Sequence, residues 1–186
     1  MATSIEELLF DDFSHYAGLM PLVAAFNRLP DVLHALGTER ALINRETSRT
    51  RIINSIVDPD AYIGDFTLIR NSIIERGVRI GGHVEINMSV IRAETEVPHF
   101  NNIGYSIVGK RVLLGAFAST SSRRLDDIPP RVRVPEMGEF VAESAKYGAL
   151  IGDDVRIGSH VCINPFTVIR KQIVVHPGTV LHGFVQ

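Results

Sequence analysis

The amino-acid sequence predicts an all-β fold, a left-handed parallel β-helix built from six-residue repeats. The first observation is an aliphatic ladder in which every sixth residue is Ile, Val or Leu from Ile151 to Leu181. The second is that small or turn-compatible residues follow several ladder positions, as Gly152, Gly158 and Asn164 do, which suits tight corners. The third is that an α-helix, with about 3.6 residues per turn, does not keep every sixth residue on one face.

Each repeat of such a coil supplies one short strand and one corner, and three repeats complete a triangular turn. The ladder side chains point inward and stack on their equivalents above and below, which buries a core that no single repeat could bury. The same spacing joins Ile74, Ile80 and Ile86, but the register slips before Val97 and again before Val108. These slips predict small bulges or loops at corners, where functional sites tend to lie.

Two segments depart from the repeat. Residues 119–146 contain three prolines, many charges and no ladder, and they predict a long excursion loop, which is typical of a functional or disordered segment. Residues 1–48 begin with a capping box at 4–7 and continue with a helix-like apolar stripe, so we expect a helical cap or connector at one end of the coil. The predicted domains are this cap and a β-helix over 49–186.

The composition excludes several partners. The net charge is −2, tryptophan is absent and no basic stripe is present, so we expect no nucleic-acid binding. No run of about 18 apolar residues predicts a membrane span, and the acidic N-terminal residues do not resemble a signal peptide. Cys162 is the single cysteine and cannot form an internal disulfide. We therefore expect a cytoplasmic protein without a membrane partner.

Six stretches of the sequence carry a family resemblance: VEINMSVI, VPHFNNIG, LLGAFAST, SSRRLDD, KYGALIGDD and GSHVCINP. In this order they resemble the acetyltransferase domain of bifunctional UDP-N-acetylglucosamine pyrophosphorylase/glucosamine-1-phosphate N-acetyltransferases and of related sugar-phosphate nucleotidylyltransferase-like proteins. A Gly-rich nucleotide-binding start is missing, so we expect the β-helix without the nucleotidylyltransferase domain. The resemblance implies acetyl-CoA as co-substrate, no metal for the transfer, and a homotrimer with sites shared between chains.

The resemblance implies that His99 is the general base, which takes a proton from the amine as that amine attacks the thioester. Glu85 matches the acidic residue that hydrogen-bonds this base and orients its imidazole. Without the resemblance, His99 would be an exposed corner histidine beside Pro98, and Glu85 an outward-facing strand residue.

The resemblance also implies a site for a sugar phosphate. Arg70, Asn87 and Lys146 fall at or near positions that contact the sugar phosphate, and the two cations suit a phosphate group. Asn87 stands where the family often has lysine. Solvated surface charge remains the alternative for both cations.

Three further positions depart from the family pattern and leave the acceptor open. Asn102 stands where a substrate-contacting tyrosine is common, and Leu113 and Ser122 stand where asparagine is usual. Three arginines lie in the excursion: Arg123, Arg124 and Arg131. They would form either a different anion-binding surface or a solvated charged face.

Ala116 and Ser159 match positions that contact acetyl-CoA, although both could be small corner residues that only pack. The sequence thus favours an acetyl-CoA-dependent N-acyltransferase acting on an amino sugar. One alternative is a non-catalytic trimeric scaffold or regulatory partner of a nucleotidylyltransferase. Another is a γ-type carbonic anhydrase, which needs three histidine ligands for zinc, but the spacing of the histidines does not resemble that family's.

Overall fold

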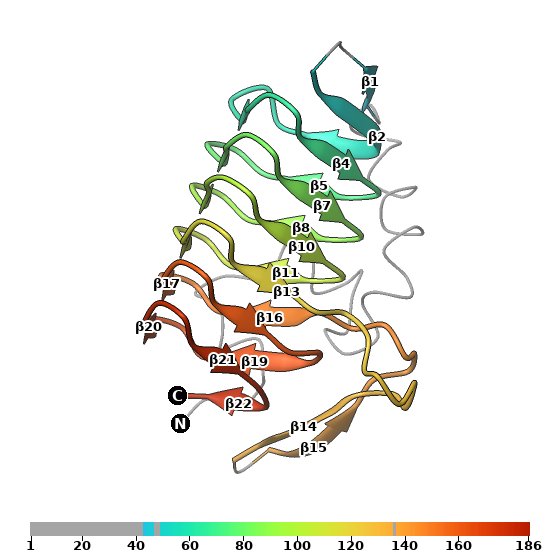
Figure 1. Cartoon of the computed structure of the whole chain (residues 1–186), viewed down its shortest axis with the longest axis vertical. Helices are drawn as coiled ribbons and strands as arrows, with labels where there is room; N and C mark the ends of the chain where they lie inside the picture. The colour runs from blue at the N-terminus through green and yellow to red at the C-terminus, as the bar shows by residue number, and fades with distance from the viewer. Residues whose placement is uncertain (1–42, 47–48, 136) are drawn as a thin grey trace.

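The described part of the chain forms a left-handed parallel β-helix, which confirms the predicted fold class (Figure 1). The computed structural model describes residues 43–46, 49–135 and 137–186. Strand β1 (Ile43–Glu46) lies antiparallel to β2 (Arg51–Val57) at one end of the coil. The other residues of the predicted helical cap over 1–48, which are 1–42 and 47–48, lie outside the described residues. Within those residues, no helix is long and apolar enough to cross a membrane.

Three faces of parallel strands build the coil, and the chain passes from the first face to the second and then the third. The first face consists of β2, β4 (Leu68–Arg70), β7 (Glu85–Asn87), β10 (Asn102–Gly104), β13 (Ser119–Thr120), β18 (Cys162–Ile163) and β21 (Val180–Leu181). The second face continues from the end of β2 through β5 (Ile73–Ile74), β8 (Val90–Ile91), β11 (Ile107–Val108), β16 (Ala149–Ile151), β19 (Thr167–Ile169) and β22 (Phe184–Val185). The third face consists of β3 (Tyr62–Ile63), β6 (Arg79–Ile80), β9 (Glu96–Val97), β12 (Leu113–Leu114), β17 (Arg156–Ile157) and β20 (Val174–Val175).

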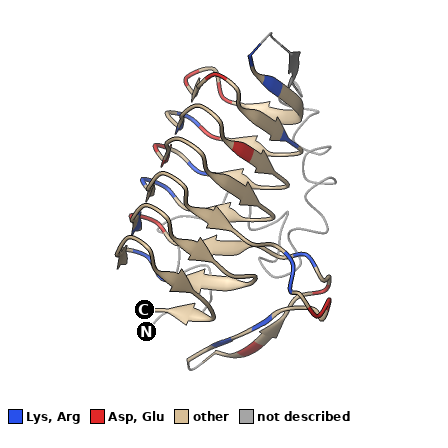
Figure 2. Ribbon diagram, in the orientation of Figure 1, with Lys and Arg blue, Asp and Glu red and all other residues tan. Residues whose placement is uncertain are grey.

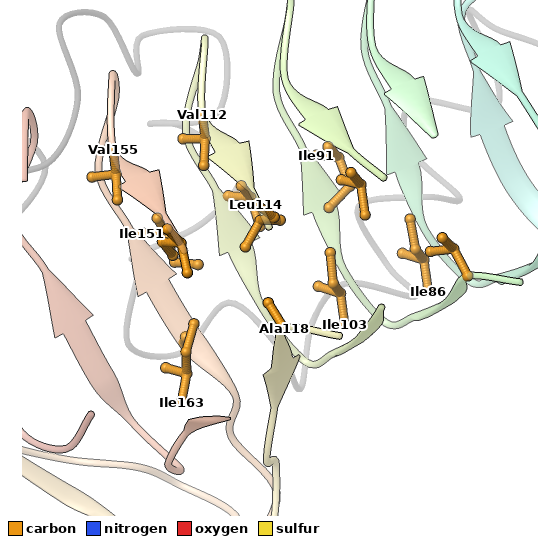
Figure 3. Packing of buried hydrophobic residues seen from close by; sticks show 14 of the residues in the cluster. Ile86, Ile91, Ile103, Val112, Leu114, Ala118, Ile151, Val155 and Ile163 are labelled. Carbon is orange, nitrogen blue, oxygen red and sulfur yellow. The ribbon is translucent and has the colours of Figure 1, made fainter. Parts of the chain in front are cut away.

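The core is a stack of inward-pointing aliphatic side chains (Figure 3). Ile69, Ile86 and Ile103 pair in register on successive coils, and all three are buried. Burial of one such side chain stabilises the fold by about 1.5–3 kcal/mol relative to its exposure. The ladder predicted from the sequence is therefore the inner surface of the prism.

The register slips have a different cause from the predicted bulges or loops. The first corner, which joins the first face to the second, is one residue shorter than a six-residue repeat in the N-terminal coils, so a coil repeats every 17 residues. The shortened turn places Asn71, Met88 and Tyr105 at φ values of 49, 50 and 53°. The slip is thus a tighter corner that recurs at one place in each coil.

Buried serines satisfy the polar groups of this tight corner. The Oγ atoms of Ser72, Ser89 and Ser106 each donate to the carbonyl oxygen two residues earlier, at 2.6, 2.9 and 2.8 Å. Each Oγ also accepts the N–H one coil further on, the last being that of Ala149 at 2.9 Å. Because buried backbone groups need partners, this serine ladder stabilises a corner that aliphatic side chains could not.

The predicted excursion is present and contains a hairpin. Residues 119 and 120 still belong to β13, and the chain then leaves the coil and forms β14 (Arg131–Val134) and β15 (Gly138–Val141) before it returns at β16. Figure 1 shows this hairpin at the C-terminal end of the coil, where β14 contacts β22. The neck of the excursion is closed by the Tyr147 N–H, which donates to the Ser122 carbonyl oxygen at 2.7 Å.

The return of the excursion depends on a close backbone approach at Gly148. A Cβ at this position would lie 2.0 Å from the Gly104 carbonyl oxygen, so the substitution Gly148→Ala forces the neck away from the coil. We expect it to lower the free energy of unfolding by about 1–3 kcal/mol, measured by urea denaturation. Gly104→Ala is the matched control, because its nearest contact would be 3.9 Å away, and we expect a change within about 0.5 kcal/mol. Equal stability of the two variants would contradict the explanation.

Candidate active site

The predicted general base and the two predicted acyl-donor residues lie in one column on the third corner, which joins the third face to the first. The Phe117 N–H donates to the His99 carbonyl oxygen at 3.2 Å, and the His160 N–H donates to that of Ala116 at 2.9 Å. His99, Ala116 and Ser159 therefore occupy equivalent positions on successive coils. The excursion separates the last two in sequence but not in space.

An aromatic stack runs beside this column. Neighbouring ring centroids of the stack lie 4.8–4.9 Å apart. Its members occupy one equivalent place on successive coils, one residue after the place of the column: Phe66, His83, Phe100, Phe117 and His160. The ring of Phe100 is 49% exposed, so the stack presents an edge to the surface. This feature was not predicted, although the 17-residue spacing of aromatic and histidine residues was its signal in the sequence.

The His99 side chain lies over Gly81 of the preceding coil. A Cβ on Gly81 would lie 3.1 Å from His99 Nδ1 and 2.9 Å from the carbonyl carbon of Pro98. Among residues 49–135 and 137–186, no side chain or backbone group forms a hydrogen bond with the His99 imidazole. His99 is exposed, and its ring leaves no room for a Cβ at Gly81.

Glu85 forms an ion pair with Arg70, which lies on the neighbouring strand of the first face. The two side chains are 43% and 38% exposed, so solvent screens the pair. Sequence reasoning missed this contact and assigned Glu85 to His99 instead. The role of Glu85 as the partner of the base remains a prediction.

The other predicted substrate residues lie on or beside the first face. Asn87 pairs in register with Arg70 on the neighbouring strand, and Asn102 pairs in register with Glu85. Lys146 and Ser122 come from the neck of the excursion. The Lys146 ammonium lies 5.5 Å from the centroid of the Tyr105 ring, a cation–π contact at the first corner that was not predicted. Leu113 lies elsewhere, in β12 on the third face.

Three buried polar atoms in this region lack a hydrogen-bond partner within the described ranges: Arg70 Nε, Asn87 Oδ1 and Asn101 Oδ1. A buried polar atom without a partner costs about 1–3 kcal/mol, and in a native structure it often marks a place that a ligand or water completes. The first face between the third corner and the neck therefore has unused hydrogen-bonding capacity. Within the described part of one chain, no three His, Cys, Asp or Glu side chains are grouped to hold a metal ion.

Comparisons with known proteins agree with this picture. The chain is 34% identical to the bifunctional protein GlmU of Methanococcus vannielii over 106 residues, which are 56% of this chain and 25% of that protein. It is 36% identical to the putative uncharacterized acetyltransferase YaiX of Escherichia coli over 110 residues, 59% of this chain and 47% of that protein. It is 30% identical to a bifunctional sugar-1-phosphate nucleotidylyltransferase/acetyltransferase of Sulfurisphaera tokodaii over 125 residues, 67% of this chain and 29% of that protein.

The chain thus spans less than half the length of these curated relatives. A family model described as the GMPPB C-terminal domain matches residues 51–174, which include most of the coil and the excursion. Because this match covers more than half of the chain, the protein belongs to the GMPPB C-terminal domain family.

Proposed function

We propose that this protein transfers an acetyl group from acetyl-CoA to the amine of a phosphorylated amino sugar. The observation that carries the proposal is the column of His99, Ala116 and Ser159 at the edge of the first face. The column would align the thioester with the base, and the polar first face would hold the sugar. The names of the relatives, which include an acetyltransferase and a sugar-1-phosphate nucleotidylyltransferase/acetyltransferase, support the same reaction class.

In this mechanism, His99 takes a proton from the sugar amine as the nitrogen attacks the thioester carbonyl carbon. The resulting tetrahedral intermediate collapses, the carbon–sulfur bond breaks, and the imidazolium returns the proton to the leaving thiolate. Because no group in the described ranges forms a hydrogen bond with the His99 imidazole, its nitrogens are available to the substrate. A backbone N–H near Ala116 is the candidate donor to the oxyanion.

The phosphate of the acceptor would bind to Arg70, whose Nε has no hydrogen-bond partner among the described residues, and to Lys146 at the neck. A phosphate that accepts hydrogen bonds from the Arg70 guanidinium competes with Glu85 for the same cation. Binding of the acceptor would then free Glu85 to contact the amine or the base. We also propose a homotrimer in which neighbouring chains complete each acyl-donor groove.

A second candidate is a non-catalytic β-helix that assembles or regulates a nucleotidylyltransferase. Two observations favour it: the matching family model describes a C-terminal domain, and the chain aligns with only 25% of a bifunctional relative. The departures at Asn102, Leu113 and Ser122 also fit an altered pocket. Labelled acetyl-CoA and a panel of amino sugars separate the two candidates, since the scaffold shows neither turnover nor coenzyme A binding.

The first test is His99→Ala. Loss of a general base lowers kcat by about 10²–10⁴-fold, and because the side chain is exposed the fold should be unaffected. Transfer from labelled acetyl-CoA to glucosamine-1-phosphate gives kcat, and circular dichroism checks the fold. The control is His176→Ala, another exposed histidine of the same corner. Full activity of the His99 variant would rule out this residue as the base.

Gly81→Ala tests whether the position of the imidazole matters. The new Cβ would meet His99 Nδ1 and the Pro98 backbone, so we expect kcat to fall by roughly 10–100-fold while KM for acetyl-CoA stays unchanged. Gly109→Ala is the control, because its Cβ would lie 2.6 Å from the Gly152 backbone. Gly109 is at the second corner, which joins the second face to the third, away from the base. A similar loss in both variants would indicate general distortion of the coil.

Arg70→Gln tests phosphate recognition on the first face. We expect KM for glucosamine-1-phosphate to rise by about 10–100-fold, since a hydrogen bond to a charged group contributes about 1.5–3 kcal/mol. The free energy of unfolding should change by less than about 1 kcal/mol, because the ion pair with Glu85 is half-exposed. An unchanged KM would remove Arg70 from the acceptor site.

A further inference from the structure

A pocket of about 640 Å³ lies apart from the proposed active site, between the neck of the excursion and the first corner of the last two coils. One wall comes from Ser121, residues 123–126 and Arg131, and the other from 164–165 and 182–183. Figure 2 shows basic positions gathered at the neck and along β14. The lining does not include His99, Arg70 or Lys146, although Arg123 forms a backbone bridge with Lys146.

The groups that line this pocket offer hydrogen-bond donors to an anion. Its walls carry Arg123, Arg124, Arg131 and His182 together with one carboxylate, Asp126, while Asp127 and Glu139 pair with Arg123 and Arg131. Each guanidinium has five N–H donors, and the contacts with protein acceptors use only one edge of it. Within the described part of the chain the remaining edges have no protein acceptor, so their donors can bind a ligand that carries several oxygen acceptors.

Neighbouring carboxylates pair with all three of these arginines, and Arg131 Nη1 lies 3.9 Å from Glu139 Oε2. Arg123 Nε donates to Asp127 Oδ1 at 2.6 Å, and Arg124 Nε donates to Asp126 Oδ1 at 2.8 Å. The Ile128 N–H donates to the same Asp126 oxygen at 3.2 Å, which fixes the carboxylate within a turn. The contact with Arg124 lowers the pKa of Asp126 from 3.8 to about 2, so this pair is lost only as the pH falls through that value.

The neck that carries the arginines is itself anchored to the coil. Arg123 forms an antiparallel bridge with Lys146, and the next residue, Tyr147, packs its buried ring against Phe166 with centroids 4.2 Å apart. The backbone at Arg123 is therefore anchored to the coil, and Arg131 is fixed in β14 by its pairing with β15. A preorganised set of donors loses less entropy on binding than donors on a free loop.

The same pocket has an apolar side. Leu125 is 106% exposed, and Pro165 lies on the opposite wall. A volume between about 300 and 1,000 Å³ is typical of small-molecule sites. We propose that this pocket binds a phosphorylated small molecule, with its phosphate groups on Arg123, Arg124 and Arg131 and a planar or apolar group beside Leu125.

Calorimetric titration of the full chain with pyrophosphate and with ADP tests the proposal. We expect both probes to bind and the Arg124→Gln/Arg131→Gln double variant to lose at least tenfold in affinity for each. Arg156→Gln, an exposed arginine on the third face, is the matched control and should bind like the unmodified chain. No binding of either probe, or equal losses in the double variant and the control, would overturn the proposal.

Leu125→Ser distinguishes the source of the phosphate. Weaker binding of ADP with unchanged binding of pyrophosphate assigns a nucleotide-like ligand to the pocket. If Leu125→Ser and the unmodified chain bind both probes equally, the pocket recognises only the phosphate groups of its ligand, through the arginines. His99→Ala should bind both probes normally, so failure of the proposed acetyl transfer would leave this test unaffected.

Discussion

Stacking of one coil on the next is the constraint on which the rest of this structure depends. Each strand forms its hydrogen bonds with the strands one coil before and after, and each inward isoleucine packs on its equivalents, as Ile86 does between Ile69 and Ile103. A residue on one coil therefore has a defined neighbour above and below it. This geometry turns distant sequence positions such as His99, Ala116 and Ser159 into a column, with no further interaction required.

Corners convert this regular stack into specific sites. At the first corner, loss of one residue per coil is compatible with burial because the hydroxyls of Ser72, Ser89 and Ser106 replace the missing backbone partners. The chain leaves and re-enters the coil at this same corner, where Ala149 takes the next place on the serine ladder. At the third corner the stacked rings and the column of His99, Ala116 and Ser159 reach the surface.

The charged groups divide into structural and surface-exposed sets. At the second corner, which joins the second face to the third, Arg92 and Asp153 are 2% and 0% exposed. Asp153 Oδ1 lies 3.6 Å from Arg92 Nη1 and accepts the Lys110 N–H at 2.7 Å, so it joins the coils on either side of the excursion. The Arg70–Glu85 pair and the arginines of the neck are much more exposed. Solvent weakens their contribution to stability and leaves them available for recognition.

The sequence by itself determined the coil, because a six-residue aliphatic period directly predicts which side chains point inward. Its family resemblance also named candidate acceptor residues, but their position on or beside the first face came from the structure. Only the tertiary structure decided that Glu85 pairs with Arg70 and that the excursion contains a hairpin beside β22. These features depend on coil length and on contacts across the prism. The six-residue aliphatic period does not reveal that one coil takes 17 residues, and without that length the surface neighbours on successive coils cannot be paired.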